Sequence, residues 1–382
     1  MNRISRRSFV QAGIAATLTA GAAIGASRHA AAAAPAGARV DFTSDGVALS
    51  PIEYAQLVSK LTTPATTLDE YSRGGPVTEL EQRFARLLGK EAAVFMPSGT
   101  LANHLAVRAL AGAKRRIVVQ QTSHLYNDCG DCAQELSRLT LLPLAPGQAT
   151  FTWDDVASEV SRAAGGRVAT AIGAISIESP VRRLGHAMFD FAQMQRISGE
   201  ARKLGIGMHL DGARLFVEAA YAKRELAEYT RLFDTVYVSL WKCFNAGNGA
   251  ILAGPHALID DMYQARRMFG GAMRHAWPDA LVASHYAEGY LERLRAAVGI
   301  AEQAWAALGA DPRFHVERVA NGTSALRLAV AGVAPEAYQA RLARLGVQLP
   351  DAQAGVFTLH VNETAARIGA ADLAKRFKAA LV

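Results

Sequence analysis

The stretch TVYVSLWKCFNAGNGAILAG, residues 235–254, places a lysine where a buried strand ends. Apolar and β-branched residues predict strands over residues 235–241 and 249–253, around a turn rich in Gly and Asn. Lys242 directly follows the first strand. Because burying an ammonium without a partner is costly, this lysine reaches solvent, pairs with a carboxylate or acts as an amine nucleophile.

Strands and amphipathic helices alternate along most of this chain of 382 residues. Near-continuous apolar runs predict buried strands, and apolar residues at helical spacing predict helices. The predicted strands include residues 116–120, 169–179 and 207–213, and the predicted helices include residues 80–88, 101–111 and 190–204. This alternation is typical of an α/β protein with a mostly parallel sheet.

The sequence pattern changes near residue 275. Long Ala- and Arg-rich stretches with helical spacing follow, together with shorter strand-like segments. We therefore expect a large domain over residues 39–274 and a smaller α+β domain over residues 275–382.

In the helix over residues 80–88, we expect one buried face. Its members are Leu80, Phe84, Leu87 and Leu88.

The first 34 residues have the layout of a secretory signal peptide, with a basic start, an apolar middle and an alanine tract. The apolar part is too short to span a membrane comfortably. Arg6 and Arg7 stand in the sequence Ser-Arg-Arg-Ser-Phe-Val, which resembles a twin-arginine export signal. The sequence therefore predicts export to the periplasm, with no membrane attachment after signal removal.

The net charge and the distribution of basic residues argue against nucleic acid as a partner. Four of the 41 Lys and Arg residues lie in the first 34 positions, which hold no acidic residue, so signal removal lowers the formal net charge from +7 to +3. The chain has no stripe of Lys and Arg with interleaved aromatic residues. Nucleic-acid binding is therefore not expected.

Cys129 and Cys132 form a Cys-x-x-Cys pair, and Cys243 has no evident partner. In an oxidising compartment such a pair can be a disulfide or a redox pair. No thioredoxin-like first strand leads into it, and the chain has no second Cys pair for zinc. The alternative is two cysteines on a helix face, and no metal site is predicted.

Four polar features fall at the carboxyl ends of predicted strands, where open parallel sheets bind ligands. The turn Ser98-Gly99-Thr100 opens a helix and offers an anion site. Asp211 ends a buried strand, and His124 and Lys242 follow two others. An amine, a carboxylate, an anion site and an imidazole are the groups needed to hold pyridoxal 5'-phosphate.

This order of features resembles the threonine aldolase and β-eliminating lyase family of fold-type I pyridoxal-phosphate enzymes. The strings that carry the resemblance are SDGV (44–47), GKEAAVFMPSGTLANHLA (89–106), SHLY (123–126), HLDGARLF (209–216), SLWK (239–242) and RRMFGGAMR (266–274). The resemblance implies an aspartate-aminotransferase-like large domain and homodimers or homotetramers in which neighbouring subunits complete each site.

The resemblance also implies a role for each residue. Lys242 would form the Schiff base with pyridoxal phosphate, and Asp211 would pair with the ring nitrogen. Ser98, Gly99 and Thr100 would bind the phosphate. His124 would stack on the ring and serve as a base. Arg214 would lie near the phenolate of the cofactor or the carboxylate of the substrate.

Three departures from the family pattern concern the substrate. Trp241 precedes Lys242 where the family has a serine, and no histidine directly follows the strand that ends at Glu178. Residues 354–362 lack the arginine that binds the substrate carboxylate in the family. A carboxylate still needs a cation, preferably a bidentate one. The substrate-binding candidates are Ser44, Arg214, Arg182, Arg183 and Arg327.

We therefore expect an exported lyase that cleaves a β-hydroxy-α-amino acid, such as threonine, into glycine and an aldehyde. His124 would take the proton of the β-hydroxyl. Two alternatives keep the cofactor and change the reaction to β-elimination or racemisation of another amino acid. A third is a pyridoxal-phosphate-binding protein without catalytic activity.

Overall fold

The computed structural model describes residues 39–382, which belong to one compact unit. The export signal expected over residues 1–34 lies outside the described residues. None of the described helices is both long and apolar enough to cross a membrane.

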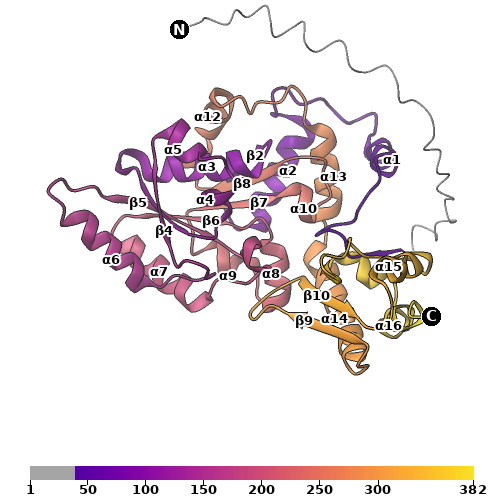
Figure 1. The fold of residues 1–382 in the computed structure, drawn as a ribbon. Helices are drawn as coiled ribbons and strands as arrows, with labels where there is room; N and C mark the ends of the chain where they lie inside the picture. Colours follow the sequence, from indigo (N-terminus) through magenta and orange to yellow (C-terminus); the bar gives the residue numbers. More distant parts are fainter. Residues whose placement is uncertain (1–38) are drawn as a thin grey trace, which may run out of the picture. The chain divides into compact units, whose positions relative to one another are not determined.

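The central sheet has seven strands in the order β2-β8-β7-β6-β5-β3-β4 (Figure 1). They are β2 (Ala92–Met96), β8 (Ala250–Gly254), β7 (Thr235–Ser239), β6 (Gly207–Asp211), β5 (Ile172–Glu178), β3 (Arg116–Gln120) and β4 (Thr140–Leu144). β8 runs antiparallel to both of its neighbours, and the other pairs are parallel. The predicted α/β fold with a mostly parallel sheet is confirmed.

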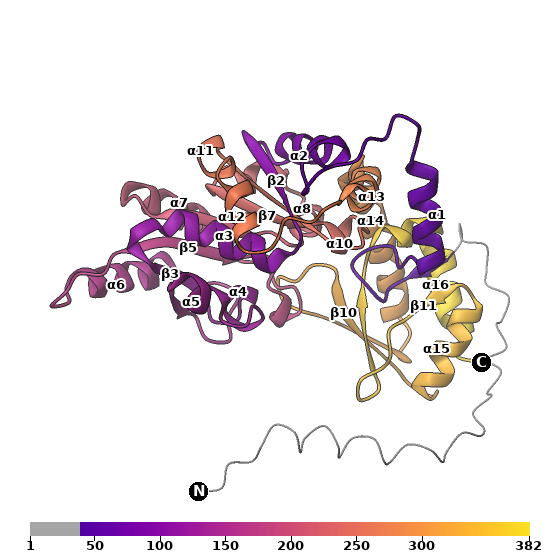
Figure 2. The same ribbon diagram turned by 90° about the horizontal axis from the view of Figure 1, so that it is seen from above.

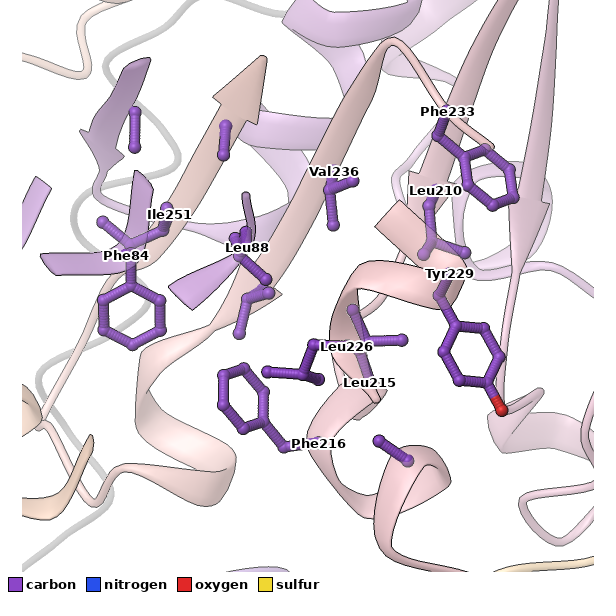
Figure 3. Packing of buried hydrophobic residues seen from close by; sticks show 14 of the residues in the cluster. Phe84, Leu88, Leu210, Leu215, Phe216, Leu226, Tyr229, Phe233, Val236 and Ile251 are labelled. Atoms are coloured by element: carbon purple, nitrogen blue, oxygen red, sulfur yellow. The ribbon is translucent and has the colours of Figure 1, made fainter. Parts of the chain in front are cut away.

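Helices cover both faces of this sheet, which explains why its central strands are mostly apolar. Along β2, Val94 and Met96 pack on one face, and Phe95 packs on the other. One layer contains α3 (Gly99–Ala111), α5 (Cys132–Ser137) and α12 (Met262–Met268). The other contains α2 (Gly75–Leu87), α6 (Trp153–Ala164), α7 (Phe191–Lys203), α8 (Leu215–Ala222) and α9 (Leu226–Thr230). Figure 3 shows residues of this second layer, with Phe84 beside Ile251 of β8.

Two local predictions are wrong. Leu80 and Phe84 of α2 and Leu88 directly after it are buried as expected, but Leu87 is 37% exposed because it lies on the solvent side of the helix. The strand expected over residues 235–241 ends at Ser239, and Leu240–Cys243 forms the short helix α10. Lys242 therefore lies in a helical turn directly after the strand.

The C-terminal residues build a second core around the antiparallel sheet β12-β10-β9 (Figure 2). Its strands are β9 (Phe314–Arg318), β10 (Ala325–Val330) and β12 (Val356–His360). Its helices are α14 (Tyr290–Gly309), α15 (Pro335–Arg344) and α16 (Ala370–Ala379). The remaining α-helices are α1 (Pro51–Leu61), α4 (His124–Asn127), α11 (His256–Ile259) and α13 (Trp277–Ala287).

The first described residues join this second core. β1 (Val40–Asp41) pairs in parallel with β11 (Val347–Gln348), and the Phe42 ring lies 5.4 Å from the Trp305 ring. Beyond β1, the backbone N–H of Val47 donates to Oδ1 of Asn245 at 2.7 Å. Residues 43–47 are thereby held between the second core and the segment that carries Lys242.

Candidate active site

The polar residues predicted from the sequence lie after strand ends at the carboxyl edge of the central sheet. Asp211 is the last residue of β6 and pairs in register with Glu178, the last residue of β5. Lys242 follows β7, and His124 follows β3. Ser98 follows β2 and caps α3 by accepting a hydrogen bond from the Leu101 N–H. Because these strands run in one direction, their ends meet at one edge.

Lys242 lines a cavity of about 660 Å³. Arg214, Ser44, Asp45 and His360 line the same cavity. Burial lowers the pKa of the Lys242 amine, and the Arg214 guanidinium lowers it further, while nearby carboxylates act in the opposite direction. A lowered pKa increases the fraction of neutral amine, which is the form that attacks an aldehyde.

Asp211 is fixed by a buried chain of hydrogen bonds. Asn103 Nδ2 donates to its Oδ2 at 2.6 Å, and the Ala213 N–H donates to its Oδ1 at 3.2 Å. His209 lies 2.8 Å from Asn103 Oδ1 through Nε2 and 2.9 Å from Thr235 Oγ1 through Nδ1. Burial lowers the pKa of His209 to about 4, so its imidazole is neutral at pH 7. The network orients the carboxylate without adding a positive charge beside it.

His124, Thr100 and Cys129 lie together beside α3. Nδ1 of His124 is 3.3 Å from Sγ of Cys129, and that sulfur is 3.8 Å from Oγ1 of Thr100. The backbone N–H of His124 donates to Oε2 of Glu178 at 2.5 Å. The expected base and the expected phosphate-binding turn are therefore linked through Cys129, a contact that the sequence prediction did not include.

Arg214 and Asp45 form a buried ion pair. Nε of Arg214 lies 3.0 Å from both carboxylate oxygens, and Nη2 lies 2.8 Å from Oδ2. Burial alone would raise the pKa of Asp45, but the guanidinium outweighs it and lowers this pKa to about 2. The pair uses part of the five N–H donors of the guanidinium, so donors remain for a second carboxylate.

His186 and His360 lie beside this ion pair. Their ring centroids are 5.1 Å apart, and Nδ1 of His360 is 3.7 Å from Oδ1 of Asp45. Burial and the Arg214 charge lower the pKa of His186 to about 3 and lower that of His360. Sequence reasoning missed both residues because they come from a turn and from β12, far from the family motifs.

These histidines and Asp45 offer ligand atoms within 4.8 Å of one another, a spacing that a metal ion can bridge. The Asp45 carboxylate, however, already accepts from Arg214 through both oxygens. A metal ion here would face a fixed guanidinium charge. The arrangement therefore suits an anionic substrate group, held by the remaining Arg214 donors, better than a cation.

The other candidate arginines have partners elsewhere. Arg182 and Arg183 both pair with Asp128 at 2.6 Å, and Arg327 pairs with Glu317 at 3.2 Å. None of the three belongs to the residues that line the Lys242 cavity. Among the candidates for the substrate carboxylate, the structure brings Arg214 and Ser44 to the cavity.

Glu178 is a buried carboxyl group that the sequence prediction omitted. Its Oε1 accepts a hydrogen bond from the Arg182 N–H at 2.9 Å, and its other oxygen accepts from His124. Burial and the neighbouring Asp211 charge raise the pKa of Glu178 to about 7. Its position at the end of an apolar strand, as for Asp211, was the signal available in the sequence.

The free energy of unfolding is expected to fall as pH rises from 4.5 to about 7, partly because of Glu178. The native state keeps this proton up to about pH 7, whereas the unfolded chain releases it near 4.5. Across this pH range, the shifted pKa of Glu178 changes the free energy of unfolding by about 3 kcal/mol in total. Denaturant titrations at several pH values should show a flatter pH dependence for Glu178→Gln. The exposed Glu79→Gln is the control, and equal slopes for wild type and Glu178→Gln would contradict the assignment.

The donor set at this edge fits pyridoxal phosphate. The first N–H groups of α3 have no acceptor within the helix. A Cβ at position 99 would overlap the Tyr237 hydroxyl, so a glycine is needed for the start of α3 to pack against this side chain. The buried Ser123 hydroxyl, next to His124, has no hydrogen-bond partner among the described residues. The Lys242 amine and the Asp211 carboxylate would supply the two remaining contacts.

Comparison with known proteins identifies the family. A family model described as β-eliminating lyase matches residues 41–342. An aldolase of Penicillium aethiopicum is 32% identical over 252 residues, which cover 63% of this chain and 61% of that protein. An alanine racemase of Cochliobolus carbonum is 29% identical over 243 residues, which cover 63% and 60%. The chain thus spans about three fifths of the length of these curated relatives.

A solved structure extends the match over most of the chain. The crystal structure of a putative L-allo-threonine aldolase from Listeria monocytogenes is 27% identical and superimposes with a TM-score of 0.70. It covers 90% of this chain and 95% of its own. The predicted fold type is confirmed, and the chain belongs to the β-eliminating lyase family.

Proposed function

We propose that this chain is a pyridoxal-phosphate-dependent carbon–carbon lyase that cleaves a β-hydroxy-α-amino acid of the threonine type into glycine and an aldehyde. The observation that carries the proposal is the position of Lys242, whose amine lines the cavity beside Arg214 at the sheet edge that also holds Asp211. The similarity to an aldolase and to a putative L-allo-threonine aldolase supports this reaction.

When bound, pyridoxal phosphate supplies an aldehyde that bonds to amines and a ring that withdraws electrons from the α-carbon of the substrate. Lys242 provides an amine whose lowered pKa favours its reactive neutral form. The Asp211 carboxylate, held by Asn103 and the Ala213 N–H, would keep a proton on the ring nitrogen. The α3 N-terminus at Ser98, Gly99 and Thr100 would bind the phosphate.

His124 is the proposed base for the β-hydroxyl proton. In the tautomer with a proton on Nδ1, that N–H points to Sγ of Cys129, and the lone pair on Nε2 is free to accept a proton. Arg214 and Ser44 bind the substrate carboxylate, and His360, whose buried Nδ1 has no hydrogen-bond partner among the described residues, lines the same cavity. The chain itself thus binds, orients and deprotonates the substrate.

Racemisation is the second candidate, favoured by the similarity to an alanine racemase. It requires proton exchange at the α-carbon and no cleavage, so the same Lys242 and Asp211 would serve it. β-Elimination to a keto acid and ammonia uses the same first proton removal, and a binding protein without turnover would keep only the cofactor.

A panel of amino acids incubated with the purified holoprotein separates these outcomes. Threonine, allo-threonine and other β-hydroxy amino acids should release glycine and an aldehyde in equal amounts. Serine and alanine of both configurations test β-elimination and racemisation through ammonia, keto acid and chiral analysis. Release of no glycine from any β-hydroxy amino acid would refute the aldolase assignment.

We propose that residues 1–34 direct export to the periplasm by the twin-arginine route, on the basis of their basic, apolar and alanine-rich order. Replacing Arg6 and Arg7 together with lysine should leave the protein in the cytoplasm while keeping the charge of the segment. Cell fractionation followed by immunoblotting measures this. Unchanged periplasmic content would exclude the twin-arginine route.

We also propose assembly into a homodimer or homotetramer. α1 buries none of its residues, and two apolar side chains near the cavity, Ile52 and Trp241, are 71% and 53% exposed. Such surface is covered in many proteins by a second subunit. Light scattering on the purified protein should give at least twice the mass of one chain, and a monomer mass would contradict the proposal.

A further inference from the structure

The Cys129-Gly130-Asp131-Cys132 segment forms a tight turn between α4 and α5. The Cys132 N–H donates to the Cys129 carbonyl at 3.2 Å, and Gly130 and Asp131 have φ angles of 56° and 53°. A turn of this kind holds the Cα atoms of its first and fourth residues within about 7 Å. A disulfide requires Cα atoms about 4.4–6.8 Å apart. The backbone therefore already places both cysteines near bonding range.

The two thiols also influence each other's ionisation. Each one shifts the pKa of the other, and both side chains are largely buried, with 8% and 9% exposure. Cys243, the third cysteine, is buried directly after Lys242 and is not part of this turn. Cys129 and Cys132 thus form a pair within one turn. Cys243 serves as an internal control for the reaction of a buried, isolated cysteine with the oxidant.

The pair adjoins the proposed catalytic machinery. Sγ of Cys129 lies 3.3 Å from Nδ1 of His124 and 3.8 Å from Oγ1 of Thr100. Forming an S–S bond removes the thiol proton and draws this sulfur toward Cys132, to a separation of about 2.05 Å. His124 then loses the thiol as a hydrogen-bond partner.

We propose that Cys129 and Cys132 form a reversible disulfide by exchange with a low-molecular-weight disulfide, and that this bond lowers the activity of the site through His124. The second part of this inference rests on the proposed function, while disulfide formation does not. The thiolate of Cys132 attacks one sulfur of the oxidant and displaces the other half as a thiolate, which leaves a mixed disulfide on Cys132. Cys129, after losing its proton to solvent, then attacks the Cys132 sulfur and displaces the second half as a thiolate. Two protein thiols and one oxidant disulfide give one protein disulfide and two small thiols.

Two further observations favour this order of events. The neighbouring Cys129 thiol lowers the pKa of Cys132, which makes Cys132 the better attacking group. The neighbouring thiol and burial raise the pKa of Cys129, so it reacts second. Export, if it occurs as proposed, would bring the pair into an oxidising compartment.

The test treats the purified holoprotein with oxidised glutathione, blocks the remaining thiols under denaturing conditions and maps peptides by mass spectrometry. The expected product is a Cys129–Cys132 disulfide with a free Cys243, reversed by dithiothreitol. Three free thiols, or stable glutathione adducts without the internal bond, would overturn the proposal. This readout does not depend on activity, so it holds even if the enzymatic assignment fails.

The effect of the disulfide on the turnover of the enzyme is measured on the same samples. Oxidation should lower kcat by about 3- to 10-fold, the usual effect of losing one supporting hydrogen bond, and dithiothreitol should restore it. Cys132→Ser keeps the Cys129–His124 contact but cannot form the bond, so its kcat should resist the oxidant. Equal loss of activity in wild type and Cys132→Ser would overturn the link to His124. If Cys132→Ser fails to fold, Cys129→Ser, whose hydroxyl can still bond to His124, replaces it.

Discussion

Replacing Lys242 with alanine is expected to lower turnover about a thousandfold or more and to abolish covalent attachment of pyridoxal phosphate. Lys242 is the one lysine among the residues that line the cavity. Its burial and the Arg214 charge lower its pKa, which suits an amine nucleophile better than a structural ammonium.

The measurement combines absorption spectra with borohydride reduction of the holoprotein. Reduction should fix the cofactor on the peptide that contains Lys242 in the wild type and on no peptide in Lys242→Ala. Lys203→Ala, which removes an exposed lysine paired with Glu200 at 2.8 Å, is the matched control and should behave as wild type. Full turnover by Lys242→Ala, or labelling of another lysine in the wild type, would remove Lys242 from the mechanism.

Asp211→Asn is expected to lower turnover by about 10²- to 10³-fold while the protein stays folded. The amide has nearly the shape of the carboxylate but no charge with which to keep a proton on the ring nitrogen. Its single oxygen can also accept from only one of the two present donors, Asn103 Nδ2 or the Ala213 N–H. Both changes weaken the electrostatic support of the ring.

Steady-state kinetics on threonine, together with circular dichroism, measure this effect. Asp234→Asn is the control, since Asp234 accepts a hydrogen bond from the Met208 N–H near the opposite end of β6. It should change turnover little. Turnover in Asp211→Asn within twofold of wild type would show that the carboxylate does not act on the cofactor.

Much of the fold could be predicted because its signals are local. The strand over residues 116–120 agrees with β3, and the apolar run over residues 169–179 contains β5 (Ile172–Glu178). Strands covered on both faces are apolar at most positions, so they are visible without knowledge of their neighbours. Boundaries are less certain, as the early end of β7 at Ser239 shows, because a helical turn and a strand end can share the same apolar residues.

Part of the candidate site could be predicted for the same reason. Asp211, His124 and Lys242 each follow or end an apolar strand, and parallel strands bring their carboxyl ends to one edge. Glu178 obeys the same rule but was omitted, since a carboxylate at a strand end also occurs as a simple cap or surface residue. Its role became visible with its hydrogen bonds to the backbone of His124 and Arg182.

The sequence by itself determined the alternation of strands and helices, the family motifs and the chemical groups at the strand ends, because side-chain periodicity and turn chemistry act within a few residues. Only the tertiary structure decided which distant groups meet. The Asp45–Arg214 ion pair joins positions 169 residues apart, and His360 reaches the same cavity from the second core. Such contacts depend on how β1 docks against β11 and how the two cores pack, and no local pattern encodes that packing.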